Sequence, residues 1–219
     1  MLYSGGKDSN LALLKAVDYG HGIACLLSLK PSSTDSEVFH FPNVNVTELQ
    51  AKAMDLPLIS VKCGDDESSS MISLKDGLRK AKEFGVEGVV TGAIRSTYQA
   101  SRFQKVCDEL GLWCFNPLWL RDELSVLKEV VKRRFDVVIV RVAGIDSKFL
   151  GKRLDENTIR ELEKLRGYAN PAGEGGEYET LVLDMPLFKK KIVLEDFEIT
   201  GRDFDATMIV KKAYLSEKS

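Results

Sequence analysis

The sequence predicts an α/β protein with a doubly wound, mostly parallel sheet and a smaller C-terminal α+β lobe. Three observations predict it. Short apolar runs alternate with segments of helical periodicity in the first half of the chain, a pattern typical of parallel strands covered by helices on both faces. A glycine-rich turn precedes the first helical segment. After about residue 140 the runs mix polar and apolar residues, as half-buried antiparallel strands do.

In the first half, three runs of strand length are expected at residues 22–29, 57–63 and 88–91. Helical spacing of apolar residues predicts helices at residues 8–19, 47–54, 74–84 and 97–110. Thr47, followed by Gln50 three residues later, is expected to cap the second of these helices. Gly85 and Gly111 are natural ends for the last two.

The second half predicts a strand at 135–142, a polar helix at 157–165, a glycine-rich stretch at 173–176 and strands at 178–183, 191–199 and 207–214. Because the pattern changes here, we place the boundary between a first domain, residues 1–135, and a second lobe, residues 136–219.

Composition narrows the class of protein. The 219 residues include 31 basic and 33 acidic side chains, for a net charge of −2, whereas nucleic-acid-binding domains usually carry a basic excess. No two of the four cysteines have the C-x-x-C spacing of zinc sites. Neither a signal peptide nor an apolar run of ~18 residues is present, so we expect a cytoplasmic protein without a membrane span.

The glycine turn has the composition of a phosphate-binding loop. It follows a very short strand and leads into a helix, so its N–H groups and the helix N-terminus point at one place, where an anion can bind. Glycines allow the backbone conformations and the close ligand approach that this requires. The residues of the turn are Ser4, Gly5, Gly6, Lys7, Asp8 and Ser9.

Two side chains of this turn carry charge. Lys7 is expected to stabilise departing pyrophosphate, and because no core role is evident, Lys7→Ala should leave folding intact. Asp8 is a candidate ligand of Mg²⁺; equally, it is an ordinary first-turn residue that complements the helix dipole. The turn fits neither the Walker A nor the dinucleotide-binding pattern, and a plain turn before a capped helix is the structural alternative.

Three motifs together point to a family. The turn resembles the signature SGGxDS of the N-type ATP pyrophosphatases, or PP-loop enzymes. With residues 91–99 and with residues 173–180 and 183–188, the chain resembles the diphthine–ammonia ligase family over nearly its whole length. The resemblance implies a PP-loop fold and an enzyme that uses ATP and ammonium to amidate diphthine on translation elongation factor 2. It also implies release of AMP and pyrophosphate.

The resemblance also assigns the nucleotide site. Gly92 and Ala93, at the end of the strand at 88–91, are expected beside the nucleotide, because open α/β sheets bind ligands at the carboxyl ends of strands. By analogy with other enzymes of this fold, the strand end at Leu27, Ser28 and Leu29 is expected to offer main-chain groups to adenine. His40 is either a nucleotide contact or an exposed loop histidine.

The acceptor is expected to contact Arg95, Tyr98 and Arg102. Tyr98 and Arg102 are four residues apart and share a helix face, so they could hold the α-phosphate or the acceptor carboxylate; the alternative is a solvated basic helix. Glu174 and Glu177 are expected either to bind the trimethylammonium of diphthine or to accept a proton from ammonia. Glu179 is left unassigned.

Free ammonium is the expected nitrogen source, since a glutamine-hydrolysing site needs a cysteine with a histidine base and the chain has only two histidines. Two other functions remain open: a PP-loop enzyme that modifies tRNA, and an adenine-nucleotide sensor without catalysis. A homo-oligomer is compatible with the sequence.

Overall fold

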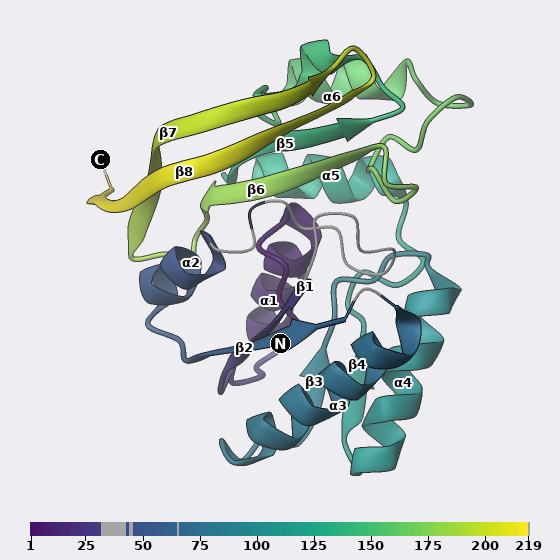
Figure 1. Cartoon of the computed structure of the whole chain (residues 1–219), viewed down its shortest axis with the longest axis vertical. Coiled ribbons are helices and arrows are strands. Elements are labelled where there is room, and N and C mark those ends of the chain that lie inside the picture. Colours follow the sequence, from purple (N-terminus) through teal and green to yellow (C-terminus); the bar gives the residue numbers. More distant parts are fainter. Residues whose placement is uncertain (32–42, 44–45, 65, 219) are drawn as a thin grey trace.

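The protein has two layers of strands with helix α1 (Lys7–Asp18) between them (Figure 1). The computed structural model describes residues 1–31, 43, 46–64 and 66–218. One layer is parallel and comes from the first half of the chain; the other is antiparallel and comes from the second half. The α/β class predicted from the sequence is therefore confirmed.

The parallel layer consists of two short strand pairs. β1 (Leu26–Pro31) pairs with β2 (Leu58–Cys63), and β3 (Gly88–Val90) pairs with β4 (Trp113–Phe115). Residues 1–3 lie between the pairs: the Leu2 amide donates to the Val90 carbonyl (2.9 Å), and the Tyr3 amide donates to the Leu27 carbonyl (2.8 Å). This three-residue segment makes one isolated bridge with β1, so the described strands form two small sheets instead of one continuous sheet.

Helices cover the parallel layer on both faces. α3 (Glu67–Lys82) and α4 (Thr97–Leu110) enclose one apolar cluster with β1 and β3, whereas α1 lies against the opposite face. Both helices are followed by a glycine with positive φ, Gly85 at 72° and Gly111 at 65°, as predicted. α3 starts seven residues earlier than the apolar spacing predicts, because the Asp66 side chain caps it by accepting the Ser69 amide.

Helix α2 (Thr47–Met54) has the predicted bounds, but the predicted capping box is wrong. Its N-cap is Val46, with no side-chain cap, and Thr47 and Gln50 are buried. The Gln50 amide donates instead to the carbonyls of Gly5 (2.9 Å) and Val182 (2.7 Å). Gln50 therefore joins the glycine turn to the second half of the chain.

The antiparallel layer has the strand order β6-β5-β8-β7. Its strands are β5 (Asp136–Ala143), β6 (Tyr178–Asp184), β7 (Lys190–Arg202) and β8 (Asp205–Glu217). The other elements are α5 (Glu123–Lys132), the 3-10 helix η2 (Ser147–Phe149) and α6 (Glu156–Glu163). Sequence reasoning found neither α5 nor β4. One apolar cluster joins α1 and α5 to β5 and β6, so the boundary at residue 135 stays a prediction.

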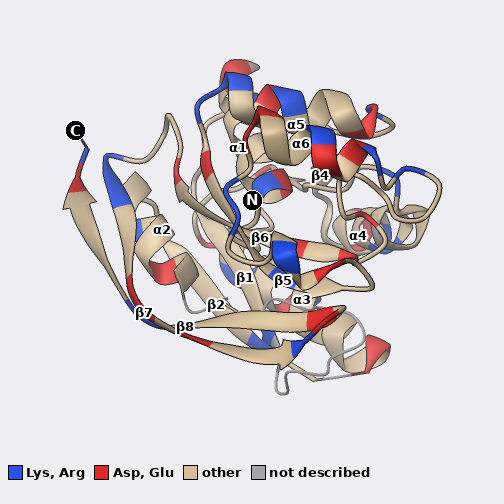
Figure 2. Cartoon of the chain, turned by 90° about the horizontal axis from the view of Figure 1, so that it is seen from above, with Lys and Arg blue, Asp and Glu red and all other residues tan. Residues whose placement is uncertain are grey.

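Acidic and basic residues are interspersed along the helices and strands (Figure 2). On the hairpin of β7 and β8, for example, Lys211 pairs with Glu198 at 2.9 Å and Lys212 pairs with Glu195 at 2.7 Å. None of the helices in the described part of the chain has the length and apolar character needed to cross a membrane.

Candidate active site

The glycine turn lies directly before α1, and Gly6 is the N-cap of that helix. Gly5 has φ +83°, and a Cβ on it would lie 2.5 Å from Gln50 Oε1. A Cβ on Gly6 would lie 3.2 Å from the Thr180 carbonyl oxygen. Position 5 therefore favours glycine for its conformation, and a side chain at position 6 would crowd the Thr180 carbonyl.

The turn lies against β6, an edge strand of the antiparallel sheet. The Gly5 carbonyl accepts the Val182 amide (3.1 Å), and the Lys7 amide donates to Thr180 Oγ1 (3.1 Å). Within the turn, the Gly6 amide donates to Ser4 Oγ (3.3 Å). Hydroxyl oxygens thus occupy two of the main-chain donors at the helix N-terminus, where an anion is expected to bind.

Lys7 has a structural role that sequence reasoning missed. Its side chain is buried, and Nζ donates to the Ala172 carbonyl (2.6 Å) and to Asp8 Oδ2 (2.8 Å). Burial lowers the pKa of Lys7, whereas the charge of Asp8 and, more weakly, Tyr178 and Glu174 raise it. The raising effects together are larger, so the net shift of the pKa is upward. The expectation that Lys7 has no core role is wrong, because its ammonium group ties α1 to the segment before β6.

Asp8 has one carboxylate oxygen free for a ligand. Oδ2 accepts from Lys7, whereas Oδ1 is buried and has no hydrogen-bond partner among the described residues. A buried, unsatisfied carboxylate oxygen is costly unless a donor or a cation reaches it. Mg²⁺ takes one or two carboxylates together with substrate phosphates, so this oxygen fits such an ion. Within the described residues, no group of three or more potential metal ligands is gathered.

A cavity of about 380 Å³ opens beside the turn. It lies at the carboxyl ends of β1 and β3 and is closed on the other side by the residues that lead into β6. Nine predicted site residues line it: Ser4, Gly6, Lys7, Asp8, Ser9, Leu27, Gly92, Ala93 and Glu174. Six others are not among the lining residues: Gly5, Ser28, Arg95, Tyr98, Arg102 and Glu177. His40 lies outside the described residues.

The main chain of Leu27 is already engaged. Its amide donates to the Met1 carbonyl (2.8 Å) and its carbonyl accepts the Tyr3 amide (2.8 Å). Leu27 can therefore offer only its side chain to a ligand. The main-chain N–H and C=O groups of successive strand residues point to opposite edges of the strand. Those of Leu29 therefore point to the same edge as those of Leu27, past the point where residues 1–3 end. Leu29 also lines the cavity.

Arg95, Tyr98 and Arg102 lie outside the cavity wall. The Tyr98 hydroxyl donates to Glu67 Oε2 (2.6 Å), Arg102 pairs with the same carboxylate, and the Arg102 guanidinium lies 3.2 Å from the Tyr98 ring centroid. The expectation that Tyr98 and Arg102 share a helix face is confirmed by this contact. Arg95 pairs with Glu123 at 3.2 Å and is half exposed.

Glu174 is the predicted glutamate that lines the cavity. Burial, and then the nearby charge of Asp8, raise its pKa to about 7, although Lys7 and the main-chain N–H of Arg95 act in the opposite direction. Glu174 is thus a half-buried carboxyl beside the glycine turn. A cation bound between Glu174 and Asp8 would relieve the repulsion between the two carboxylates.

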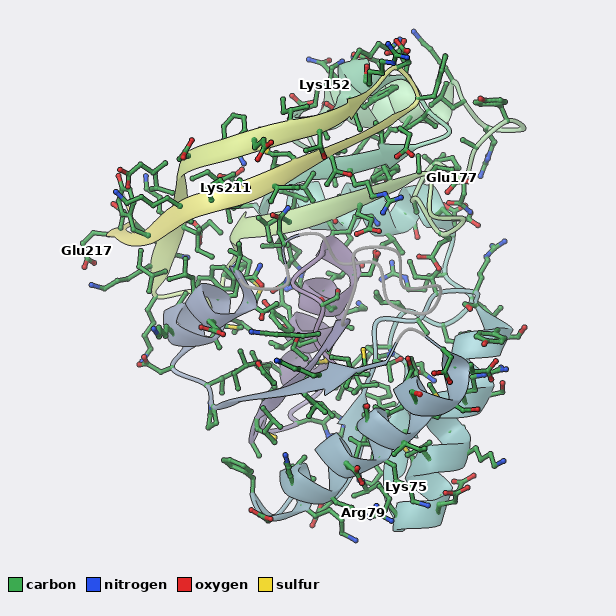
Figure 3. The ribbon with its side chains drawn as sticks, in the orientation of Figure 1. Lys75, Arg79, Lys152, Glu177, Lys211 and Glu217 are labelled. Atoms are coloured by element: carbon green, nitrogen blue, oxygen red, sulfur yellow. The ribbon has the colours of Figure 1, made fainter. Side chains whose placement is uncertain are left out.

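Glu177 does not reach the cavity. Its carboxylate accepts the amides of Asn170 (2.6 Å) and Gly175 (2.9 Å). Figure 3 shows it in the loop that enters β6. In this arrangement Glu177 closes the glycine-rich loop that carries Glu174.

Several cavity residues were not found from the sequence. Glu179 was left unassigned, and Thr91, Phe103 and Thr180 were not considered, yet all four line the cavity. Burial raises the pKa of Glu179 to about 7, opposed by Arg141 and Lys7. The glutamate-rich motif was the sequence signal that could have pointed to Glu179. It could not show that Glu179 lines the cavity and Glu177 does not.

The fold and site together define an α/β protein with a glycine turn at a helix N-terminus, set beside a cavity that contains carboxyl groups. Residues 1–114 match the family model of the diphthamide synthase N-terminal domain, and residues 122–216 match that of the diphthamide synthase C-terminal domain. The chain therefore belongs to the diphthamide synthase family, which confirms the family predicted from its motifs.

Curated relatives carry a consistent name. Proteins named diphthine–ammonia ligase from Bos taurus and Homo sapiens are each 36% identical to this chain, over 94% of it and 85% of their own length. A relative of the same name from Schizosaccharomyces pombe is 37% identical over 99% of this chain but only 39% of its own length. The chain thus spans well under half of that longer relative.

Among solved structures, a predicted subunit of tRNA methyltransferase from Methanocaldococcus jannaschii is similar, with a TM-score of 0.41 and 13% identity. The similarity covers 84% of this chain and 95% of that structure.

Proposed function

We propose that this protein is a diphthine–ammonia ligase: it joins ammonium to the diphthine carboxylate of translation elongation factor 2, using ATP and releasing AMP and pyrophosphate. The family membership and the relatives' names support the reaction. The observation on which the proposal depends most is the glycine turn facing a cavity with an unsatisfied Asp8 oxygen. We also propose that the enzyme is cytoplasmic, where it would meet elongation factor 2.

In this proposal the α/β layer acts as a doubly wound PP-loop domain. Residues 1–3 supply the middle strand, with hydrogen bonds to β1 on one side and β3 on the other. The triphosphate lies over Gly5 and Gly6. The amides of Gly6 and Lys7 then donate to phosphate oxygens in place of the hydroxyls of Ser4 and Thr180. Asp8 would hold Mg²⁺ through its unsatisfied carboxylate oxygen, and the ion would neutralise phosphate charge.

Adenine lies at the ends of β1 and β3. The side chain of Leu27 and the main chain of Leu29 face it, and Gly92 and Ala93 bound the opposite side of the same cavity. A Cβ on Gly92 would lie 2.9 Å from the Ser9 amide nitrogen, so glycine keeps β3 close to α1. His40, if it contacts the nucleotide, would act from outside the described residues.

The chemistry follows from the poor leaving group of a carboxylate. Attack of the diphthine carboxylate on the α-phosphate forms an acyl-adenylate, from which ammonia displaces AMP. The chain supplies position and charge stabilisation. Glu174 contacts the cationic end of the acceptor, Glu177 holds the Glu174 loop closed, and Arg95, Tyr98 and Arg102 form the outer rim that receives the protein substrate.

One experiment tests this function. AMP and pyrophosphate release would be measured with diphthine-bearing elongation factor 2, with and without ammonium. We expect release that depends on both, with one amide formed per AMP. ATP binding without turnover under every condition would indicate a nucleotide sensor, and turnover with tRNA in place of the factor would indicate a tRNA-modifying enzyme.

A further inference from the structure

The edge strand β6 presents its two faces to different parts of the site. Tyr178 and Thr180 belong to one face, because alternate residues of a strand share a face. That face meets the glycine turn: Lys7 Nζ lies 5.3 Å from the Tyr178 ring centroid, and the Lys7 amide donates to Thr180 Oγ1. Glu179 projects from the opposite face, yet all three residues line the same cavity. The cavity therefore extends across the edge of β6.

Glu179 has a cationic neighbour on the adjacent strand. Arg141 of β5 is its cross-strand partner, and the register between β5 and β6 shifts between Ile139 and Arg141. Such a bulge re-aims the side chains beside it and is frequent near active sites. Arg141 also lies 3.9 Å from the exposed Asp205 of β8. The guanidinium thus lies near β8, and its charge also acts on the Glu179 carboxyl across the strand pair.

The charges around Glu179 differ from those around Glu174. Asp8, on the glycine turn, is the second largest influence on the pKa of Glu174, whereas the charged groups that act on Glu179 are Arg141 from β5 and Lys7 from α1. An acidic neighbour therefore acts on Glu174, whereas the charged neighbours that act on Glu179 are basic. Both carboxyls line the cavity in which the activated carboxylate would meet its nucleophile.

A half-buried carboxylate selects a particular chemistry of ligand. It repels phosphate, and it attracts a cation. A quaternary ammonium group is best held by aromatic faces, and the aromatic side chain next to Glu179, Tyr178, lies on the other face of β6. A cation with N–H groups can instead donate hydrogen bonds to the carboxylate, and such charge-assisted bonds are the stronger ones.

Resting on the proposed function, we propose that Glu179 binds the ammonium ion and accepts its proton, and that Arg141 positions the Glu179 carboxylate. Ammonium gives one proton to Glu179, and the resulting ammonia forms the new C–N bond to the acyl carbon. The bond from that carbon to the AMP oxygen breaks, and AMP leaves with the electron pair as a phosphate dianion. The nitrogen, now bonded to the acyl carbon, loses a second proton to solvent, and the proton on Glu179 also passes to solvent. Ammonium and acyl-adenylate thus give amide, AMP and two protons.

The protonation state of Glu179 suits this step. A carboxyl whose pKa lies near 7 is a stronger base than an ordinary glutamate. Because Arg141 lowers that pKa, removing Arg141 raises it further and leaves less carboxylate at neutral pH. Amide formation should therefore fall as the pH drops below about 7, and the fall should begin at higher pH without Arg141.

The test separates the two half-reactions in the full-length protein. Adenylation is followed as exchange of labelled pyrophosphate into ATP, dependent on the protein acceptor and without ammonium. Amide formation is followed with ammonium and, separately, with hydroxylamine, a nucleophile that is already uncharged at neutral pH. The variants are Glu179→Gln, Arg141→Met and, as a matched control on the same sheet, Glu198→Gln, whose exposed carboxylate pairs with Lys211.

We expect Glu179→Gln to keep wild-type exchange, to lose about 100-fold in amide formation with ammonium, and to regain most of it with hydroxylamine. Arg141→Met should shift the acidic limb of the ammonium reaction to higher pH. Unchanged ammonium kinetics in Glu179→Gln would overturn the inference, as would a parallel loss of exchange or no gain with hydroxylamine. Absence of acceptor-dependent exchange and of amide in the wild type would instead refute the proposed function.

Discussion

Replacing Lys7 with methionine tests how the two halves of the chain are joined. Methionine keeps the length of the side chain but removes the ammonium group. In the protein that group is 4% exposed and makes two contacts, with the Ala172 carbonyl and with Asp8. The change leaves a buried carbonyl without its donor and a carboxylate without its cation, so both contacts contribute to the cost.

The size of the effect follows from these contacts. Removing one partner of a buried ion pair costs about 3–5 kcal/mol. The Asp8 side chain is 26% exposed, so water compensates part of the loss, and the low end of about 3 kcal/mol is the better expectation. For a chain of this size that corresponds to a fall in Tm of roughly 6–12 °C.

The assay is urea unfolding at pH 7 followed by circular dichroism. Lys189→Met serves as the control, because its pair with Asp55 is exposed on both sides and should contribute less than about 1 kcal/mol. Asp8→Asn in the Lys7→Met background should recover about 1 kcal/mol, since it removes the uncompensated charge. A loss below about 0.5 kcal/mol in Lys7→Met would refute the buried role of Lys7.

Three further predictions concern the site. Gly5→Ala should destabilise the fold by about 2 kcal/mol and weaken ATP binding, because φ is +83° and a Cβ would meet Gln50; wild-type ATP affinity by calorimetry would contradict this. Glu179→Gln should be more stable relative to the wild type at pH 8 than it is at pH 5, and the difference between the two pH values should be about 1–2 kcal/mol. A carboxyl with a raised folded-state pKa binds extra protons between 4.5 and about 7, so the wild type loses stability as the pH rises through that window and the variant does not; equal unfolding curves at both pH values would argue against it. Arg102→Ala should change stability by only about 1 kcal/mol, since its pair with Glu67 is partly exposed, but should raise KM for the protein acceptor and not for ATP; a rise in KM for ATP alone would place Arg102 elsewhere.

The glycine turn could be predicted because its signal is local. Six consecutive residues set the backbone conformation, the helix start and the charge, and the described geometry of Gly5 and Gly6 agrees with that pattern. Most strands and helices were predicted for the same reason, since each has its own apolar periodicity. β4 was not. It is as short as β3, but its residues Trp113–Phe115 are aromatic residues and a cysteine, without the aliphatic run that marks β3 at Gly88–Val90.

The roles of Lys7 and Gln50 could not be predicted, because their partners are distant in sequence. Ala172 is 165 residues from Lys7, and Val182 is 132 residues from Gln50. The spacing of Thr47 and Gln50 favours a capping box locally, but the carbonyls of Gly5 and Val182 offer Gln50 two buried hydrogen bonds instead. Tertiary contacts outweighed the local preference.

The sequence motif alone does not distinguish the three glutamates at positions 174, 177 and 179. Their difference arises from strand geometry: Glu177 closes a loop through two amides, Glu174 faces Asp8, and Glu179 lies opposite Arg141 across β5 and β6. Only the register of the antiparallel sheet, which joins residues about 40 apart, distinguishes Glu179 from its neighbours.

The most direct test is a crystal structure with a non-hydrolysable ATP analogue and Mg²⁺. We expect oxygens of the β- and γ-phosphates to lie about 3 Å from the main-chain nitrogens of Gly6 and Lys7, with the ion against Asp8 Oδ1. Phosphates bound away from this turn, with Ser4 Oγ and Thr180 Oγ1 still accepting those two amides, would contradict it.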